Sequence, residues 1–122
     1  MIRKTISLSL GGEERVLMFG TLGFFEYVKE ATGKDPLEWL NNLGSEGGLT
    51  VYLEDTAAVV YAGVNTYQDS KGSPNIELKA VKKWCNAMTS GETTEVFKTA
   101  ISSFTTDEKP GEEIPNQEQA KA

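Results

Sequence analysis

Few residues in this chain have the chemistry that acid–base, nucleophilic or metal catalysis requires. The sequence contains no histidine and a single cysteine, so the commonest general base and the commonest metal ligand are missing. Cys85 follows Trp84 in an apolar stretch and has no histidine to activate its thiol. A free cysteine in such a stretch is usually a small core residue, and we favour this interpretation over a nucleophile.

Two pairs of adjacent carboxylates, at positions 13–14 and 54–55, are the other candidates for chemistry. A hard-cation site needs several oxygen ligands that converge on one point, and no loop in this sequence has that spacing. The glycine-rich segments 20–23 and 44–48 match neither the phosphate-loop nor the dinucleotide-binding pattern. We therefore interpret the acidic pairs as solvated charge, and we expect no enzyme activity, no catalytic residue, no metal site and no cofactor.

The charge balance narrows the class of partner. The formal net charge is −6 at pH 7, which argues against nucleic acid and against an anionic membrane surface. A local basic cluster follows Glu77, and we interpret it as a solvated helix face: Lys79, Lys82 and Lys83. No run approaches the roughly 18 apolar residues of a membrane span. The lone cysteine excludes an internal disulfide and favours a cytosolic setting.

The first 19 residues predict a β-hairpin with strands at about 3–10 and 14–19. Apolar and polar residues alternate in the first strand, and Gly11 with Gly12 is a turn signal. We expect one apolar face on the hairpin, made of Ile6, Leu8, Leu10, Val16 and Met18. Because a lone hairpin is only marginally stable in water, this face must pack on helices.

Five helices are expected after the hairpin, at about residues 22–32, 36–43, 51–67, 76–88 and 92–104. Thr21 and Gly33 are the expected caps of the first helix, and an Asp35–Pro36 pair opens the second. The third helix is the most apolar and is expected at the centre of the domain. The core-facing positions that we expect in the first and third helices are Leu22, Phe25, Val28, Leu53, Ala57, Val60 and Val64.

The predicted fold class is mostly α, of the α+β type, with an N-terminal hairpin packed on about five short helices. Residues 1–104 are expected to form one domain. Residues 105–122 contain one large apolar residue, Ile114, and more acidic than basic residues. Such a segment cannot bury enough apolar surface to offset its ordering entropy, so we expect a disordered acidic tail.

Aromatic residues are the candidate binding residues of this chain. They are more numerous around the first two helices than one core-facing stripe requires. Two interpretations are open: the hairpin covers Phe24 and Tyr27, or these rings form an exposed patch for a partner. The candidate protein-binding residues are Phe24, Tyr27, Trp39, Tyr61 and Tyr67.

In the order of its elements, the chain resembles the tail assembly chaperones of long-tailed bacteriophages. The resemblance spans about residues 5–104 and is carried by segments 17–22, 53–67 and 76–104. It implies a non-enzymatic protein that binds the tape measure protein and recruits tail tube subunits. It also implies a location in the host cytoplasm, absence from the mature virion, and a longer form made by ribosomal frameshifting. Self-association is left open.

Two other functions remain as alternatives at this point. The chain could be a structural tail or head–tail connector protein of a phage virion. It could also be a small acidic adaptor or inhibitor that docks on a host protein.

Overall fold

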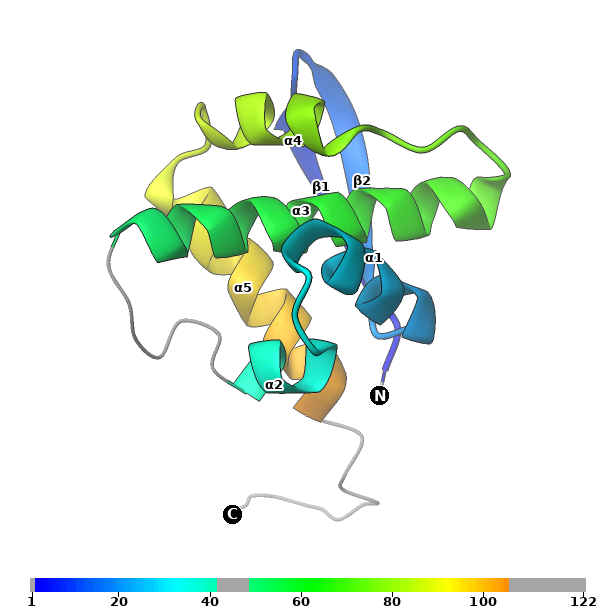
Figure 1. The fold of residues 1–122 in the computed structure, drawn as a ribbon. Helices are drawn as coiled ribbons and strands as arrows, with labels where there is room; N and C mark the ends of the chain where they lie inside the picture. The colour runs from blue at the N-terminus through cyan, green and yellow to red at the C-terminus, as the bar shows by residue number, and fades with distance from the viewer. Residues whose placement is uncertain (1, 42–48, 106–122) are drawn as a thin grey trace, which may run out of the picture.

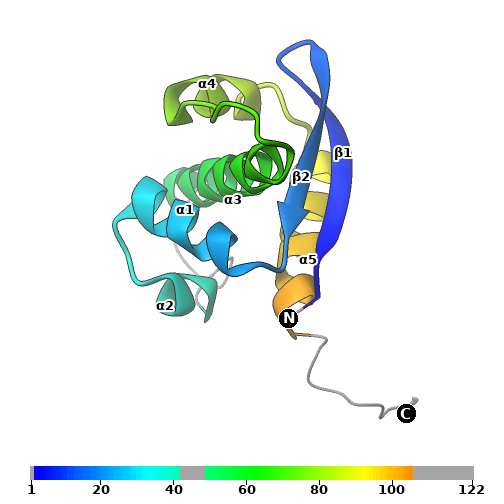
Figure 2. The ribbon, with the colours of Figure 1, turned by 90° about the vertical axis from the view of Figure 1, so that its right-hand side faces the viewer.

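The structure is a computed structural model that describes residues 2–41 and 49–105. Strands β1 (Lys4–Leu10) and β2 (Glu13–Phe19) precede the helices α1 (Leu22–Thr32), α2 (Pro36–Asn41), α3 (Leu49–Lys71), α4 (Leu78–Cys85) and α5 (Ser90–Thr105). Helix α3 crosses the middle of the molecule, with α1 and α4 on either side of it (Figure 1). These three helices lie on one side of the hairpin (Figure 2). The predicted α+β fold is confirmed, with α3 as its central helix.

The two strands form the predicted antiparallel hairpin, closed by a two-residue turn. Gly11 has a φ of 63° and Gly12 a φ of 84°, and two positive φ values in succession define a type I′ turn. The turn brings Leu10 opposite Glu13, and the register continues from there to Lys4 opposite Phe19.

The core-facing side of β2 differs from the prediction. Leu17 lies opposite Ile6 in the register and is fully buried, as is Phe19. Val16 lies opposite Ser7, so Val16 and Met18 point to the other side of the hairpin. Val16 is half-buried, so the expectation that it faces the core with Ile6 was wrong, whereas Met18 is buried, although it lies on the side opposite to Ile6. The apolar run 16–19 has no alternation that sets its phase.

Helix α1 begins and ends at the predicted caps. The backbone N–H of Phe24 donates to Thr21 Oγ1 at 3.3 Å, and the N–H of Gly33 donates to the Lys29 carbonyl at 2.7 Å. Gly33 has a φ of 73°, the left-handed conformation that glycine adopts without strain.

The buried side of α1 is shifted by one residue from the prediction. Phe24 and Val28 are fully buried, Phe25 is half-buried, and Leu22 is 70% exposed. The expectation that Leu22 faces the core was wrong. Leu22 is the first helical residue, and side chains on a helix tilt toward its N-terminus, so this one extends past the end of the core.

Helix α3 is longer than predicted at both ends, and its middle is surrounded by other elements. Every residue from Asp55 to Thr66 is buried. The expectation that Asp55 is solvated in the first turn of this helix was wrong, because the helix begins six residues earlier, at Leu49. The closest approach to the hairpin is at Gly63, where an added Cβ would lie 2.9 Å from Phe19 Cε1 and 3.0 Å from Leu17 Cβ.

The remaining boundaries have local causes. Helix α4 begins at Leu78 rather than near residue 76, because the buried Asn65 side chain binds both backbone groups of Ile76. Its Oδ1 accepts the N–H of Ile76 at 2.6 Å, and its Nδ2 donates to the Ile76 carbonyl at 2.9 Å. Helix α5 begins at Ser90 rather than near residue 92, because Thr89 and Glu92 form a reciprocal capping box. Helix α5 includes Thr105, and the rest of the predicted tail, 106–122, lies outside the described residues.

We expect Gly63→Ala to lower the free energy of unfolding, although alanine is the better helix former by about 1 kcal/mol. The added methyl group would push two fully buried side chains apart, and overpacking of this kind costs about 1–3 kcal/mol. The matched control is Gly23→Ala in α1, where the nearest atom to an added Cβ is Thr21 Oγ1 at 3.8 Å. Urea unfolding should show a loss for Gly63→Ala and none for Gly23→Ala; equal stability of both variants would contradict the close helix–hairpin approach.

Candidate functional site

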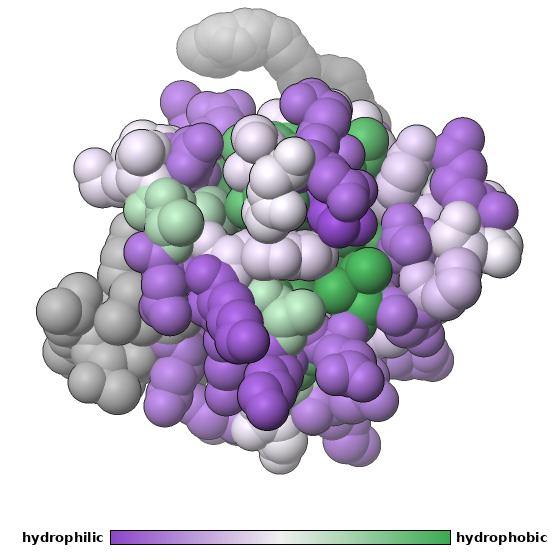
Figure 3. Space-filling model, turned by 90° about the horizontal axis from the view of Figure 1, so that it is seen from above, coloured by the Kyte–Doolittle hydropathy of each residue, from purple (hydrophilic) through white to green (hydrophobic). Residues whose placement is uncertain are grey.

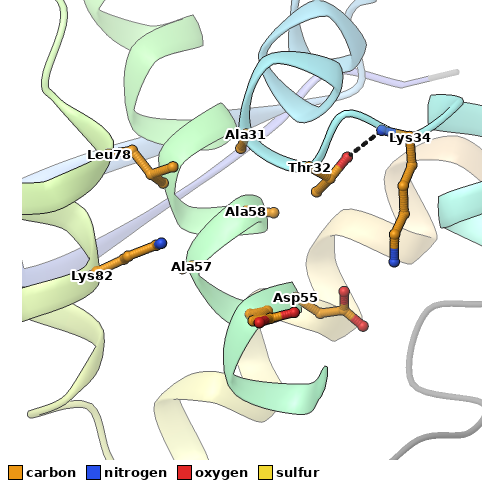
Figure 4. A pocket seen from close by; sticks show the side chains of 9 residues that line it. Ala31, Thr32, Lys34, Asp55, Ala57, Ala58, Leu78 and Lys82 are labelled. Atoms are coloured by element: carbon orange, nitrogen blue, oxygen red, sulfur yellow. Dashed lines mark hydrogen bonds between the residues drawn. The ribbon is translucent and has the colours of Figure 1, made fainter. Parts of the chain in front are cut away.

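A groove lies where the end of α1, the N-terminal half of α3 and helix α4 meet. Its main part encloses about 210 Å³ and is lined by Ala31, Thr32, Lys34, Glu54, Asp55, Ala57, Ala58, Leu78 and Lys82. A second hollow of about 110 Å³ continues it along α4 and shares Glu54, Ala57 and Lys82 with it. We call these two hollows together the α1–α3–α4 groove, and Figure 4 shows its main part from close by.

The groove exists because small side chains occupy its floor. Ala57 and Ala58 are buried in α3, and Ala31 lines the wall contributed by α1. Their methyl groups leave space that a leucine or phenylalanine would fill. Leu78, half-buried on α4, supplies the larger apolar surface opposite Ala31 (Figure 4). The space has the size of one or two side chains from a partner.

Two lysines lie on opposite walls of the groove. Lys82 extends from α4 toward the space above Ala57, and Lys34 follows the end of α1 (Figure 4). Neither lysine forms an ion pair with the residues that the structure describes. The two cationic side chains line the groove together with the acidic residues Glu54 and Asp55.

One edge of the groove is held by a buried polar pair. The Trp39 indole N–H donates to Asp55 Oδ1 at 3.0 Å, and both side chains are buried. Burial raises the pKa of the Asp55 carboxyl, while the hydrogen bond from Trp39 and the charge of Lys34 act in the opposite direction. This contact fastens α2 to α3, so Trp39 holds the structure together next to the groove.

Two of the candidate tyrosines connect α1 to α3. The Tyr27 hydroxyl donates to Asp69 Oδ2 at 2.5 Å, and the Tyr61 hydroxyl donates to Glu30 Oε1 at 2.8 Å. Their rings meet edge to face with centroids 5.8 Å apart. Burial, and then the acceptor carboxylate, raises the pKa of each hydroxyl to about 12. The arrangement is a reciprocal clamp in which each helix supplies one tyrosine and one acid.

This clamp predicts a loss of stability at alkaline pH. The folded-state pKa of Tyr27 and Tyr61 is about 12, above the ordinary 10.0, so the folded protein retains protons that the unfolded chain releases. Their contribution to stability should therefore be complete below pH 10 and fall as the pH rises through about 12. Urea unfolding of wild type and Tyr27→Phe/Tyr61→Phe across this range measures it. An equal decline in both proteins would contradict the assignment.

The candidate aromatic residues do not form one surface patch. Phe24 is fully buried against Phe19, with ring centroids 5.5 Å apart, and Trp39 is buried against Asp55. Tyr67 is half-buried, and the centroid of its ring lies 5.5 Å from Lys71 Nζ. For Phe24 the first interpretation, that the hairpin covers it, agrees with the structure. A binding role for any of the five residues stays a prediction.

Cys85 is half-buried and lines the second hollow of the groove, and burial raises the pKa of its thiol to about 11, which disfavours the nucleophilic thiolate. Within residues 2–41 and 49–105, no three potential metal ligands come together. Among the same residues, no helix has the length and apolarity needed to span a bilayer.

None of the five candidate protein-binding residues lines the groove. Alanines at positions 31, 57 and 58 are ordinary helix residues in the sequence, and only the packing of three helices leaves a hollow above them. The one available signal was the unusually small side chains in the central helix, next to the lysine cluster of α4.

On the face that includes α4 and the hairpin turn, hydrophobic residues show only in small areas between hydrophilic ones (Figure 3).

Comparison with protein-family models, with characterised proteins and with solved structures found no match to this chain.

Proposed function

We propose that this protein is a non-enzymatic tail assembly chaperone of a long-tailed bacteriophage. It binds the tape measure protein in the host cytoplasm, recruits tail tube subunits and is absent from the mature virion. The α1–α3–α4 groove is the observation that carries the proposal. It offers an apolar floor of small side chains in an otherwise hydrophilic acidic protein, which suits transient binding of a helical segment.

The order of the elements also supports this function. A hairpin, an aromatic helix, a short acidic helix, a long central helix and two further helices follow one another, as in the family that the sequence resembles. Tape measure proteins are long and prone to aggregate, and apolar residues on their helices need cover until the tail tube surrounds them. The groove would hold one or two such residues while Lys34 and Lys82 bind acidic residues that flank them.

Co-expression with the candidate tape measure protein tests the proposal. The wild type should keep that partner soluble and be recovered with it in a pull-down. Ala31→Met should fill the groove from α1 without disturbing the helix, because methionine is a good helix former and Ala31 is only half-buried. Lys82→Glu should reverse a charge on the groove wall. We expect each variant to weaken partner binding about tenfold, equivalent to about 1.4 kcal/mol.

The matched control is Lys83→Glu, which makes the same charge change on the same helix. Lys83 is exposed and does not line the groove, so this variant should bind as the wild type does. Equal losses for Lys82→Glu and Lys83→Glu would show that net charge, and not the groove, decides binding. If the wild type neither solubilises nor binds the partner, the chaperone function is wrong. Detection of the chain in purified virions would then favour a structural tail or connector protein.

A further inference from the structure

The outer edge of β1 has no partner strand. Within residues 2–41 and 49–105 the sheet consists of β1 and β2, so each strand has one edge that no described strand pairs with. Helix α3 packs closely on β2 and α5 contacts β1, and β1 lies at the right-hand rim of the molecule in Figure 2. Just before this strand, the backbone N–H of Ile2 donates to the carbonyl of Ser103 in α5.

The hairpin geometry identifies the backbone groups at this edge. Residues that flank a two-residue turn form a hydrogen-bonded pair, and bonded pairs then alternate with unbonded ones along the ladder. Leu10 flanks the turn, so the backbone groups of Leu10 and of every second residue before it bond to β2. The three residues that alternate with these direct their backbone N–H and C=O groups away from β2, and their side chains are exposed: Thr5, Ser7 and Ser9.

This edge lacks the features that usually prevent strand addition. Natural edge strands are commonly short, bulged, interrupted by proline or charged along their length. Strand β1 has seven residues, an unbroken register and no proline. Its one charged residue is Lys4 at its first position, where the ammonium group donates to Ser102 Oγ at 3.0 Å. An open edge of this kind favours pairing with another strand.

We infer that β1 is a homodimer interface, in which the β1 strands of two copies pair antiparallel about a two-fold axis at Ser7. In this register Ser7 meets Ser7 of the partner subunit, and each Thr5 meets a Ser9. All three are residues that direct backbone groups outward, so every pair exchanges two hydrogen bonds. On the core-facing side, each half-buried Ile6 lies opposite a Leu8, so the apolar faces of the two hairpins become continuous.

The pattern of the strand favours a second copy over other occupants. The central five residues of β1 alternate hydroxyl and aliphatic side chains, and this order is the same in both chain directions, as a two-fold axis requires. The two Lys4 side chains lie at opposite ends of the paired strands and do not repel each other closely. Segment 106–122 of the same chain is a poor alternative, because Pro110 and Pro115 lack the N–H that strand addition needs. The inference does not depend on the proposed function.

Charge substitutions at the axis test this arrangement. A residue on a two-fold axis meets itself, so Ser7→Lys and Ser7→Glu should each place like charges opposite one another and raise the dimer dissociation constant about two- to fivefold. An equimolar mixture of the two variants should restore dimerisation, with the mixed dimer as the main species. Analytical ultracentrifugation measures the constants, and native mass spectrometry identifies the mixed dimer. Thr94→Lys is the matched control, because it adds the same charge at an exposed position of α5.

Ser7→Pro is the second variant, because it removes an N–H directed to the open edge while the bonds to β2 remain. It should abolish the dimer. A wild type that stays monomeric at millimolar concentration would overturn the inference, as would a dimer that survives Ser7→Pro. If Ser7→Pro does not fold, the charge pair decides alone: a mixture of Ser7→Lys and Ser7→Glu without preferred mixed dimers would exclude an axis at Ser7.

Discussion

Leu17→Asp should prevent folding or lower the free energy of unfolding by more than about 3 kcal/mol. Leu17 is fully buried on the side of β2 that faces α3, where it lies close to Gly63. A carboxylate at this position would lose its hydration without gaining a partner, which is among the largest single-residue costs known. Soluble yield, circular dichroism and urea unfolding measure the effect.

The neighbouring residue provides the control. Val16→Asp makes a comparable change at the adjacent position, but Val16 lies opposite Ser7 on the other side of the hairpin and is only half-buried. We expect this variant to fold and to lose less than about 1 kcal/mol, as is usual for surface substitutions. If Val16→Asp is the more harmful of the two, the register or the facing of the hairpin is wrong.

Phe24→Ala should lower the free energy of unfolding by about 3–5 kcal/mol, the range measured when a large aromatic side chain is removed from a core. The Phe24 ring is fully buried, and its centroid lies 5.5 Å from that of Phe19 and 5.4 Å from that of Phe104. It therefore connects α1 to the hairpin and to the end of α5. Its removal would leave a cavity at the junction of three elements.

Leu22→Ala is the matched control on the same helix, two residues earlier. Leu22 is 70% exposed, so its truncation should change the free energy of unfolding by less than about 0.5 kcal/mol. Urea unfolding of both variants distinguishes core from surface. Normal stability of Phe24→Ala together with weaker partner binding would favour the second interpretation of the aromatic residues, a binding patch.

Local sequence signals determined the elements and several of their ends. The two glycines of the turn, the threonine before α1 and the glycine after it act through backbone conformation or through hydrogen bonds within a few residues. Such interactions need no information from the rest of the chain. For this reason the hairpin, the caps of α1 and the start of α2 after Asp35 agree with the prediction.

The sequence alone did not determine which side of an element faces the core. In β2 the run 16–19 is apolar at every position, and in α1 the residues Leu22, Phe24, Phe25 and Val28 offer two overlapping stripes. A shift of one residue turns a strand over, and a comparable shift rotates a helix by about 100°. Contact with the elements packed around them, α3 and α5 among them, decides between these alternatives, because it buries Leu17, Phe24 and Val28 and leaves Val16 and Leu22 nearer to solvent.

Buried polar contacts and hollows likewise depend on residues that are distant in the sequence. Trp39 and Asp55 are 16 positions apart, Tyr61 and Glu30 are 31 apart, and Tyr27 and Asp69 are 42 apart. The α1–α3–α4 groove arises where three helices meet above small side chains, and an alanine carries no local sign of the space beside it. The sequence by itself thus determined the hairpin, the helices and their order. The tertiary structure decided which aromatic residues are buried and where the groove lies, because burial depends on what packs against a residue.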